Sequence, residues 1–354
     1  MTTAIRTIRA GAAALGAGLL FAAGGALAQD IPPVEVTVIG NLGITTQSKT
    51  LEAPFWTGGV TEASNGAITA QFKPFNEMGL KGPEIFRLLG QGVTNIATGQ
   101  FGHHAGDAPI NDATDLAGLS TSMQEFRTVT DAFRPVISKF YEDQLGLKIL
   151  TMQSYQSQIL YCREPIAGLK DLAGKRIRTS GASQADFVGY FGGTGVNMAF
   201  GEVQQALQQG VIDCAITGTL GGYVAGWHQG ARYLYTLPIN FGAGATVANL
   251  GWWNGLPEVT QTFLQEQLTA LSEKMWALNM EEDQMGIACN TSGPCPLGEP
   301  AGMTRVDPSP EDIALRATAM REVVLPGFAK RCGPECVAAF NDTIGKATGL
   351  TITQ

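Results

Sequence analysis

The chain has 354 residues, of which 31 are acidic and 23 are basic, and its formal net charge is −8 at pH 7. This balance argues against nucleic acid and anionic lipid surfaces as partners, because like charges repel. After the N-terminus, no segment contains the roughly 18 consecutive apolar residues that a membrane span needs.

The first 28 residues predict a cleavable secretory signal peptide. Arg6 and Arg9 form a basic start, an apolar stretch follows, and the small residues at 26–28 offer a cleavage site. We expect an exported mature chain that begins near Gln29 and carries a net charge of about −10. Its length of about 326 residues exceeds what one core comfortably supports, so we expect two lobes.

Strand-like and helical patterns alternate along the mature chain. Runs rich in β-branched residues predict strands at 34–40, 67–75, 94–99, 147–153, 175–180 and 211–218. Apolar spacing and turn residues predict helices at 82–92, 126–141 and 201–210, and a longer one at 257–278. This alternation is typical of α/β layers with mostly parallel sheets.

Two segments repeat the same pattern, "RLLGQGVTNIATGQFG" at 87–102 and "QALQQGVIDCAITGTLG" at 205–221. Each has a helix, a glycine, a short strand and a glycine-rich loop. Gly92 and Gly210 can adopt the left-handed conformation that ends a helix. One such unit in each of two facing lobes would place both loops at the carboxyl ends of the sheets, where open α/β sheets bind ligands. Chance similarity between two common βα units is the alternative.

All six cysteines lie in the mature part, and an even number suits an oxidising compartment. The short spacers of "CNTSGPC" and "CGPEC" predict two local disulfides, Cys289–Cys295 and Cys332–Cys336. Cys162 and Cys214 are either free buried thiols or a third bridge. The three-residue spacer of "CGPEC" and the absence of a nearby histidine argue against a metal site.

Sequence motifs for catalysis are missing. "GAGATV" at 242–247 lacks the third glycine of a dinucleotide-binding loop, "FGGTG" at 191–195 lacks the P-loop lysine, and no G-x-S-x-G elbow occurs. Adjacent His103 and His104 would point to different sides of an extended chain and make a poor metal pair. We therefore expect no catalytic residue, no cofactor and no metal.

The segment 169–215 combines a D-L-x-G-K-x-I-R strand, a helix with a glycine-rich end, a M-x-F-x-E-V-x-x-A-L-Q-x-G helix and a V-x-D strand. It resembles the solute-binding subunits of tripartite ATP-independent periplasmic (TRAP) transporters, in the group named for dicarboxylate uptake. Weaker similarity covers most of residues 34–285. The resemblance implies a periplasmic, monomeric receptor that is not an enzyme, with a small organic acid as ligand and the TRAP membrane permease as partner.

The resemblance also implies an α/β, two-lobed periplasmic binding protein fold of the type II kind, with hinge strands and a long lobe-spanning helix. We expect lobe I to comprise residues 29–156 and 240–275. Lobe II would then comprise residues 157–239 and 276–354.

In the family that the segment resembles, a strand-end arginine of the second lobe grips the ligand carboxylate with two parallel donors, and Arg178 occupies that position. Phe200 matches an aromatic residue that packs against the ligand. Thr217 stands where many members have asparagine. Gln158 stands where sialic-acid-binding members carry a second arginine, which argues against that sugar acid.

Five further residues are candidate ligand contacts because they follow predicted strand ends or lie beside the hinge. They are Thr45, Phe101, His103, His104 and Tyr155. Two other functions stay open from the sequence: an exported α/β enzyme acting on a carboxylate, and a receptor for another permease or a sensor.

Overall fold

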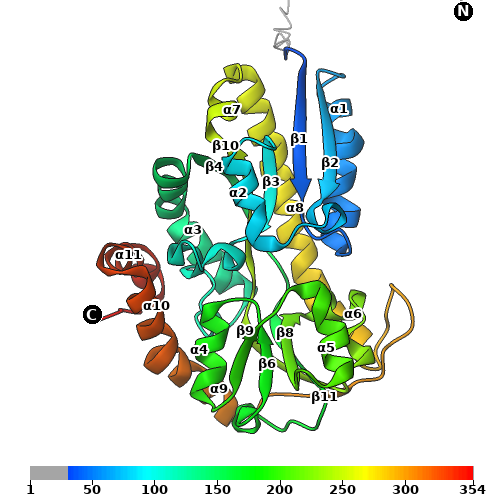
Figure 1. Cartoon of the computed structure of the whole chain (residues 1–354), viewed down its shortest axis with the longest axis vertical. Helices are drawn as coiled ribbons and strands as arrows, with labels where there is room; N and C mark the ends of the chain where they lie inside the picture. Colours follow the sequence, from blue (N-terminus) through cyan, green and yellow to red (C-terminus); the bar gives the residue numbers. More distant parts are fainter. Residues whose placement is uncertain (1–30, 354) are drawn as a thin grey trace, which may run out of the picture. The chain divides into compact units, whose positions relative to one another are not determined.

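The computed structural model describes residues 31–353 and contains two mixed β-sheets flanked by helices (Figure 1). The first sheet has the strand order β2-β1-β3-β10-β4, with β1 (Val34–Gly40), β2 (Ile68–Pro74), β3 (Ile96–Gln100), β4 (Leu147–Ser154) and β10 (Ala243–Asn249). The second has the order β11-β9-β5-β8-β6-β7, with β5 (Gln158–Cys162), β6 (Arg176–Thr179), β7 (Thr194–Asn197), β8 (Cys214–Gly218), β9 (Tyr233–Asn240) and β11 (Thr304–Val306). The two-lobed α/β class expected from the sequence is confirmed.

The chain passes from one sheet to the other at two short connections, between β4 and β5 at 154–158 and between β9 and β10 at 240–243. These four strands account for the antiparallel pairs, since β10 runs against β3 and β4, and β5 runs against β8 and β9. The remaining pairs are parallel, as expected. The crossing points support the lobe boundaries given above, which we keep as a proposal.

Helices cover both sheets. They are α1 (Val60–Ala63), α2 (Ile85–Gly90), α3 (Met123–Phe140), α4 (Ala182–Tyr190), α5 (Val203–Gln209), α6 (Thr219–Val224), α7 (Leu250–Asn254), α8 (Glu258–Asn290), α9 (Pro310–Ala319), α10 (Leu325–Cys332), α11 (Pro334–Phe340) and α12 (Lys346–Thr348). The C-terminal helices contact both α3 and α4. In the part of the chain that the structure describes, no helix combines the length and apolarity needed to cross a bilayer. The expected signal peptide lies outside the described residues.

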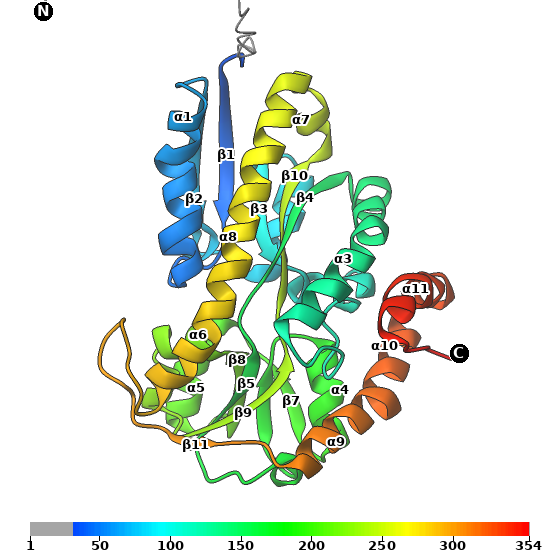
Figure 2. The same cartoon turned by 180° about the vertical axis from the view of Figure 1, so that it is seen from behind.

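Helix α8 is the longest helix and lies along both sheets, contacting β4, β9 and α6 (Figure 2). Its apolar stripe, including Leu264 and Leu268, packs in the core of the first sheet. The helix continues beyond the predicted end at residue 278 because polar side chains take over the contacts. Asn279 donates to the Ser154 carbonyl, and Asp283 accepts from Ser157. Apolar spacing cannot show such contacts.

The two repeated segments form the same local structure. Gly92 ends its helix at φ +73°, and Gly210 ends its own at φ +72°. Strands β3 and β8 follow, although β8 begins at Cys214, three residues later than predicted. Val211 and Ile212 instead form the turn that leads into the strand. Both strands then end in short helical segments.

Three disulfides are present among the described residues. The two local pairs, Cys289–Cys295 and Cys332–Cys336, form as the spacers predicted. The third joins Cys162 of β5 to Cys214 of β8, which face each other in the antiparallel ladder. This pairing resolves the alternative that the sequence left open, because only the strand register brings the two residues together.

Candidate functional site

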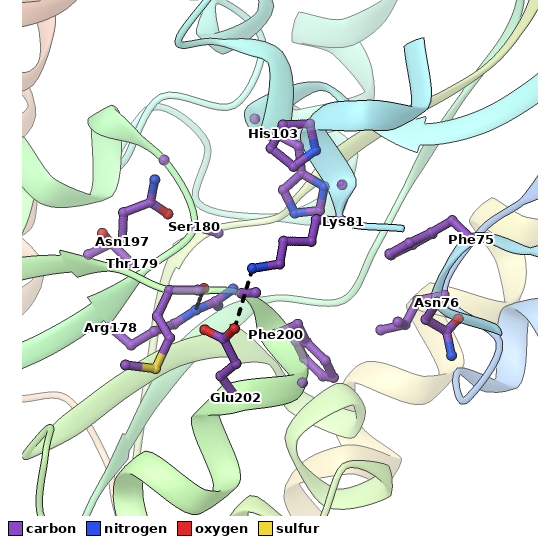
Figure 3. Close-up of a pocket in the computed structure, with 18 of the residues that line it drawn as sticks. Phe75, Asn76, Lys81, His103, Arg178, Thr179, Ser180, Asn197, Phe200 and Glu202 are labelled. Carbon is purple, nitrogen blue, oxygen red and sulfur yellow. Dashed lines mark hydrogen bonds and ion pairs between the residues drawn. The ribbon is translucent and has the colours of Figure 1, made fainter. Parts of the chain in front are cut away.

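A cleft of about 1040 Å³ is lined by loops of both sheets (Figure 3). From the first sheet come the segments after β1, β2 and β3, including Phe75, Lys81 and His103. From the second come the end of β6 and the segments before α4 and α5, including Arg178 and Phe200. The carboxyl ends of parallel strands thus meet at this cleft, as expected for an open α/β sheet.

Arg178 lies at the end of β6 and is only 3% exposed. Its Nε donates to the Met198 carbonyl at 3.1 Å, and Nη1 donates to the Ile216 carbonyl at 2.8 Å. The guanidinium carbon lies 5.7 Å from the ring centre of Trp227, a cation–π contact. These contacts fix the plane of the guanidinium and leave three of its five N–H groups for other partners.

The charge of Arg178 is not neutralised within the described residues, where no carboxylate forms an ion pair with it. Burial lowers the pKa of Arg178 to about 10, so the side chain still carries its charge at neutral pH. Burial, together with the charge of Arg178, lowers the pKa of His103 to about 4. The cleft therefore holds one buried cation beside a neutral imidazole.

A smaller recess of about 70 Å³ shares Arg178, His103 and Phe200 with the cleft. Most of the residues that line it have polar side chains, among them Asn41, Gln100 and Ser180. The predicted contacts that also line it are Thr45, His103, Tyr155, Gln158, Arg178, Phe200 and Thr217. The structure thus brings together seven of the nine candidate residues from six separate segments of the chain.

Phe101 and His104 do not reach the cleft or the recess. Phe101 is fully buried in the core, edge-on to Tyr141. His104 stacks on Phe86 with ring centres 4.0 Å apart. The segment after β3 is a helical turn and not an extended chain, so Phe101 and His104 point into the core while His103 points outward.

Three features of the site were missed from the sequence. Trp227 supports Arg178, and Phe200 lies against it with ring centres 5.1 Å apart. Lys81 and Glu202 form an exposed ion pair across the cleft mouth at 3.5 Å (Figure 3). Ser180 lies two residues after Arg178, directly after the end of β6, and this place in the sequence could have identified it. The tryptophan and the ion pair come from distant segments without any local motif.

Residues 43–330 match the model of one protein family, described as "Bacterial extracellular solute-binding protein, family 7". The chain belongs to this family. The match includes every strand of the two sheets except β1, and it includes most of the residues that line the cleft.

Two curated proteins are similar to parts of this chain. The chain is 26% identical over 178 residues to the Salmonella typhimurium protein YiiZ, covering 49% of this chain and 54% of that one. It is 27% identical over 147 residues to the ectoine-binding periplasmic protein TeaA of Halomonas elongata, covering 41% and 43%. The chain thus spans about half the length of the curated relatives that it matches.

Solved structures share the family 7 fold over nearly their whole length. The Bordetella pertussis receptor DctP7, which binds pyroglutamic acid, has a TM-score of 0.75 at 20% identity, with 87% of this chain and 99% of that chain covered. A TRAP solute-binding protein of Desulfovibrio salexigens with orotic acid reaches 0.78 at 16%, covering 88% and 99%. One of Rhodoferax ferrireducens with malonate also reaches 0.78 at 16%, covering 89% and 98%.

A buried carboxyl beside this family 7 site should make stability depend on pH. Burial raises the pKa of Asp112 to about 7, with Asp115 and Asp186 adding to the shift and Arg331 opposing it. Because the folded chain holds this proton more tightly than the unfolded chain, the stabilisation is complete below about pH 4 and is lost as pH rises through 7. The advantage of Asp112→Asn over wild type in free energy of unfolding should therefore grow by on the order of 2 kcal/mol between pH 5 and pH 8.

Urea unfolding of wild type and Asp112→Asn at several pH values between 5 and 8 measures this difference. Asp107→Asn is the matched control, because Asp107 is exposed. Its stability should follow the wild-type curve. Parallel curves for wild type and Asp112→Asn would contradict the assignment.

Proposed function

We propose that this chain is the periplasmic solute-binding subunit of a TRAP transporter, and that it captures a small organic acid for a separate membrane permease. The observation that carries the proposal is Arg178, a buried cation with unused donors that lines the cleft between the two sheets. A buried charge without a partner is costly, and a bound carboxylate would supply the partner. The planar guanidinium suits a carboxylate better than a single donor would.

The related structures support an anionic ligand. Those named above contain pyroglutamate, orotate or malonate, and another, from Desulfovibrio desulfuricans, contains sn-glycerol-3-phosphate. For this chain we propose binding through Arg178, with Phe200, Thr217, Gln158, Tyr155, His103 and Thr45 as further contacts. We also propose that the mature protein is a monomer without catalytic activity, exported by its signal peptide.

A thermal-shift screen of mono- and dicarboxylates tests the proposal. A ligand that binds only the folded state raises the unfolding temperature by mass action. We expect at least one small carboxylate to stabilise the mature protein, and mass spectrometry of denatured complexes to recover that acid unchanged. Stabilisation by neutral sugars alone, or recovery of a reaction product, would refute the proposal.

The disulfide Cys332–Cys336 should not affect ligand binding. It closes a loop of only a few residues, and neither cysteine lines the cleft or the recess. Because distant sites act nearly independently, Cys332→Ser should change the dissociation constant by less than about twofold. Titration calorimetry on the variant measures this, and a larger loss of affinity would show that the C-terminal helices take part in binding.

A further inference from the structure

A series of hydrogen bonds determines whether the Ser180 hydroxyl acts as a donor or as an acceptor in the recess. It starts at the carboxylate of Asp115, which accepts from the backbone N–H of Phe241 and of Gly242, both at 2.9 Å. The same carboxylate accepts from Asn240 Nδ2 at 2.7 Å. The amide of Asn240 is thereby oriented, and its Oδ1 accepts from Gln184 Nε2 at 2.8 Å.

The orientation of the Gln184 amide, at the other end of this series, is established independently. The backbone N–H of Ser180 lies 2.8 Å from Gln184 Oε1, and a backbone N–H can only donate. This atom of Gln184 is therefore an oxygen, whichever way the amide is assigned. The hydroxyl of Ser180 lies 3.1 Å from the same oxygen, which can only accept, so the bond between them uses the hydroxyl proton. While this bond is kept, only the lone pairs of Ser180 Oγ remain for a ligand.

The hydroxyl of Tyr155 is arranged in the same way as that of Ser180. The backbone N–H of Leu42 donates to Asn41 Oδ1 at 2.8 Å, which identifies that atom as an oxygen. Tyr155 Oη lies 2.9 Å from it, so the bond between them uses the tyrosine proton. The ring packs against β10, where a Cβ at Gly244 would lie only 3.0 Å from Tyr155 Cε2. While the bond to Asn41 is kept, Tyr155 too can only accept from a ligand.

Ser180 and Tyr155 both line the same recess as Arg178. We infer that the site selects small monocarboxylates that carry an N–H or O–H donor on their body, and that it disfavours dicarboxylates. This inference rests on the proposed function, since Arg178 must hold the acid for the body to reach the recess. A second carboxylate would place its lone pairs against those of Ser180 and Tyr155 and leave buried oxygens without partners.

The preference arises because each hydroxyl loses a hydrogen bond when it turns toward an acceptor on a ligand. To donate to a ligand, Ser180 would have to give up Gln184, and Tyr155 would have to give up Asn41. Sites built to hydrogen-bond a ligand group discriminate well against analogues that lack it. A methylene-sized difference in an apolar pocket discriminates far less.

Titration calorimetry on matched acids tests the inference. Pyroglutamate has a ring N–H, and 5-oxotetrahydrofuran-2-carboxylate has a ring oxygen in its place. Lactate has a hydroxyl, and pyruvate has a carbonyl at the same carbon. We expect the donor-bearing acid of at least one pair to bind at least about tenfold more tightly than its partner and than malonate or succinate.

Two variants show which hydroxyl is responsible for the preference for donor-bearing acids. Tyr155→Phe and Ser180→Ala each remove one acceptor, and at least one should weaken the preferred acid by about tenfold while leaving the donor-free acid within about twofold. Tyr190→Phe is the matched control, because its hydroxyl bonds Glu322 and Tyr190 does not line the recess. It should bind like wild type.

The outcomes separate the two proposals. If malonate, succinate or the donor-free acids bind as tightly as the donor-bearing acids, the inference is overturned while the carboxylate receptor stands. Equal losses for both members of a pair in Tyr155→Phe and Ser180→Ala would overturn it too. If no carboxylate of the thermal-shift screen stabilises wild type, the proposed function fails and the inference fails with it.

Discussion

Arg178→Ala should raise the dissociation constant for the acid found in the screen by about 100-fold or more, which corresponds to roughly 3 kcal/mol. The guanidinium is the only side chain among the described residues that brings a buried positive charge into the cleft. Removing it would leave a ligand carboxylate desolvated without a charged partner, which is the costliest change available in this site. Titration calorimetry on the purified variant measures the loss.

The fold should survive this substitution. In the free protein the variant loses the bonds to the Met198 and Ile216 carbonyls, but it also loses a buried charge that nothing neutralises. These effects oppose each other, so circular dichroism should show a folded chain. Arg178→Lys should bind weakly, because an ammonium group keeps the charge but not the planar fork.

Arg176→Ala is the matched control for Arg178. It lies two residues earlier on the same strand, but it is exposed and bonds Asp213 at 2.9 Å. Its removal should have little effect on stability, because surface ion pairs contribute little, and should leave affinity unchanged. Full-strength binding by Arg178→Ala, or an equal loss in both variants, would rule out Arg178 as the anchor.

The sequence was most informative where function depends on a local pattern. Arg178 could be identified because it ends a strand within a recognisable motif, and the structure places it in the cleft. The repeat predicted the turns at Gly92 and Gly210, since a left-handed residue after a helix has a clear signature. The two local disulfides were predictable for the same reason, because their spacers are short.

Features that depend on distant contacts could not be predicted. Strand β10 is rich in alanine and glycine and has little intrinsic β-preference, yet it lies between β3 and β4 and is almost wholly buried. The orientation of Ser180 depends on Asp115, which is 65 positions earlier in the sequence and acts through two amides. Trp227 reaches Arg178 only because the second sheet folds them together. Contacts between residues far apart in the sequence leave no periodic pattern from which they could be predicted.

Gly286→Ala should destabilise the protein by about 2–3 kcal/mol, although alanine normally favours a helix over glycine by up to about 1 kcal/mol. Gly286 lies in α8 where this helix crosses α6. A Cβ at this position would lie 2.7 Å from Thr219 Oγ1 and would overlap the backbone of Thr219 and Leu220. Backbone atoms cannot rotate away, so the two helices must separate. Urea unfolding measures the loss.

Separation of the helices would affect more than one contact. Asn290 donates to the Thr219 carbonyl at 2.7 Å, and Asp283 accepts from the Thr219 hydroxyl at 3.2 Å. Asp283 also holds Ser157, in the connection between the two sheets, through its backbone N–H and its hydroxyl. Gly286 thus allows the close approach that ties α8 to the crossing strands.

Gly189→Ala separates this close approach from the general effect of glycine in a helix. Gly189 lies in α4, is exposed, and has no atom within 4 Å of an added Cβ. Its replacement should therefore be neutral or stabilise by up to about 1 kcal/mol. If both variants were equally stable, α8 could shift freely against α6, and the crossing of the two helices would not hold the connection between the sheets in place.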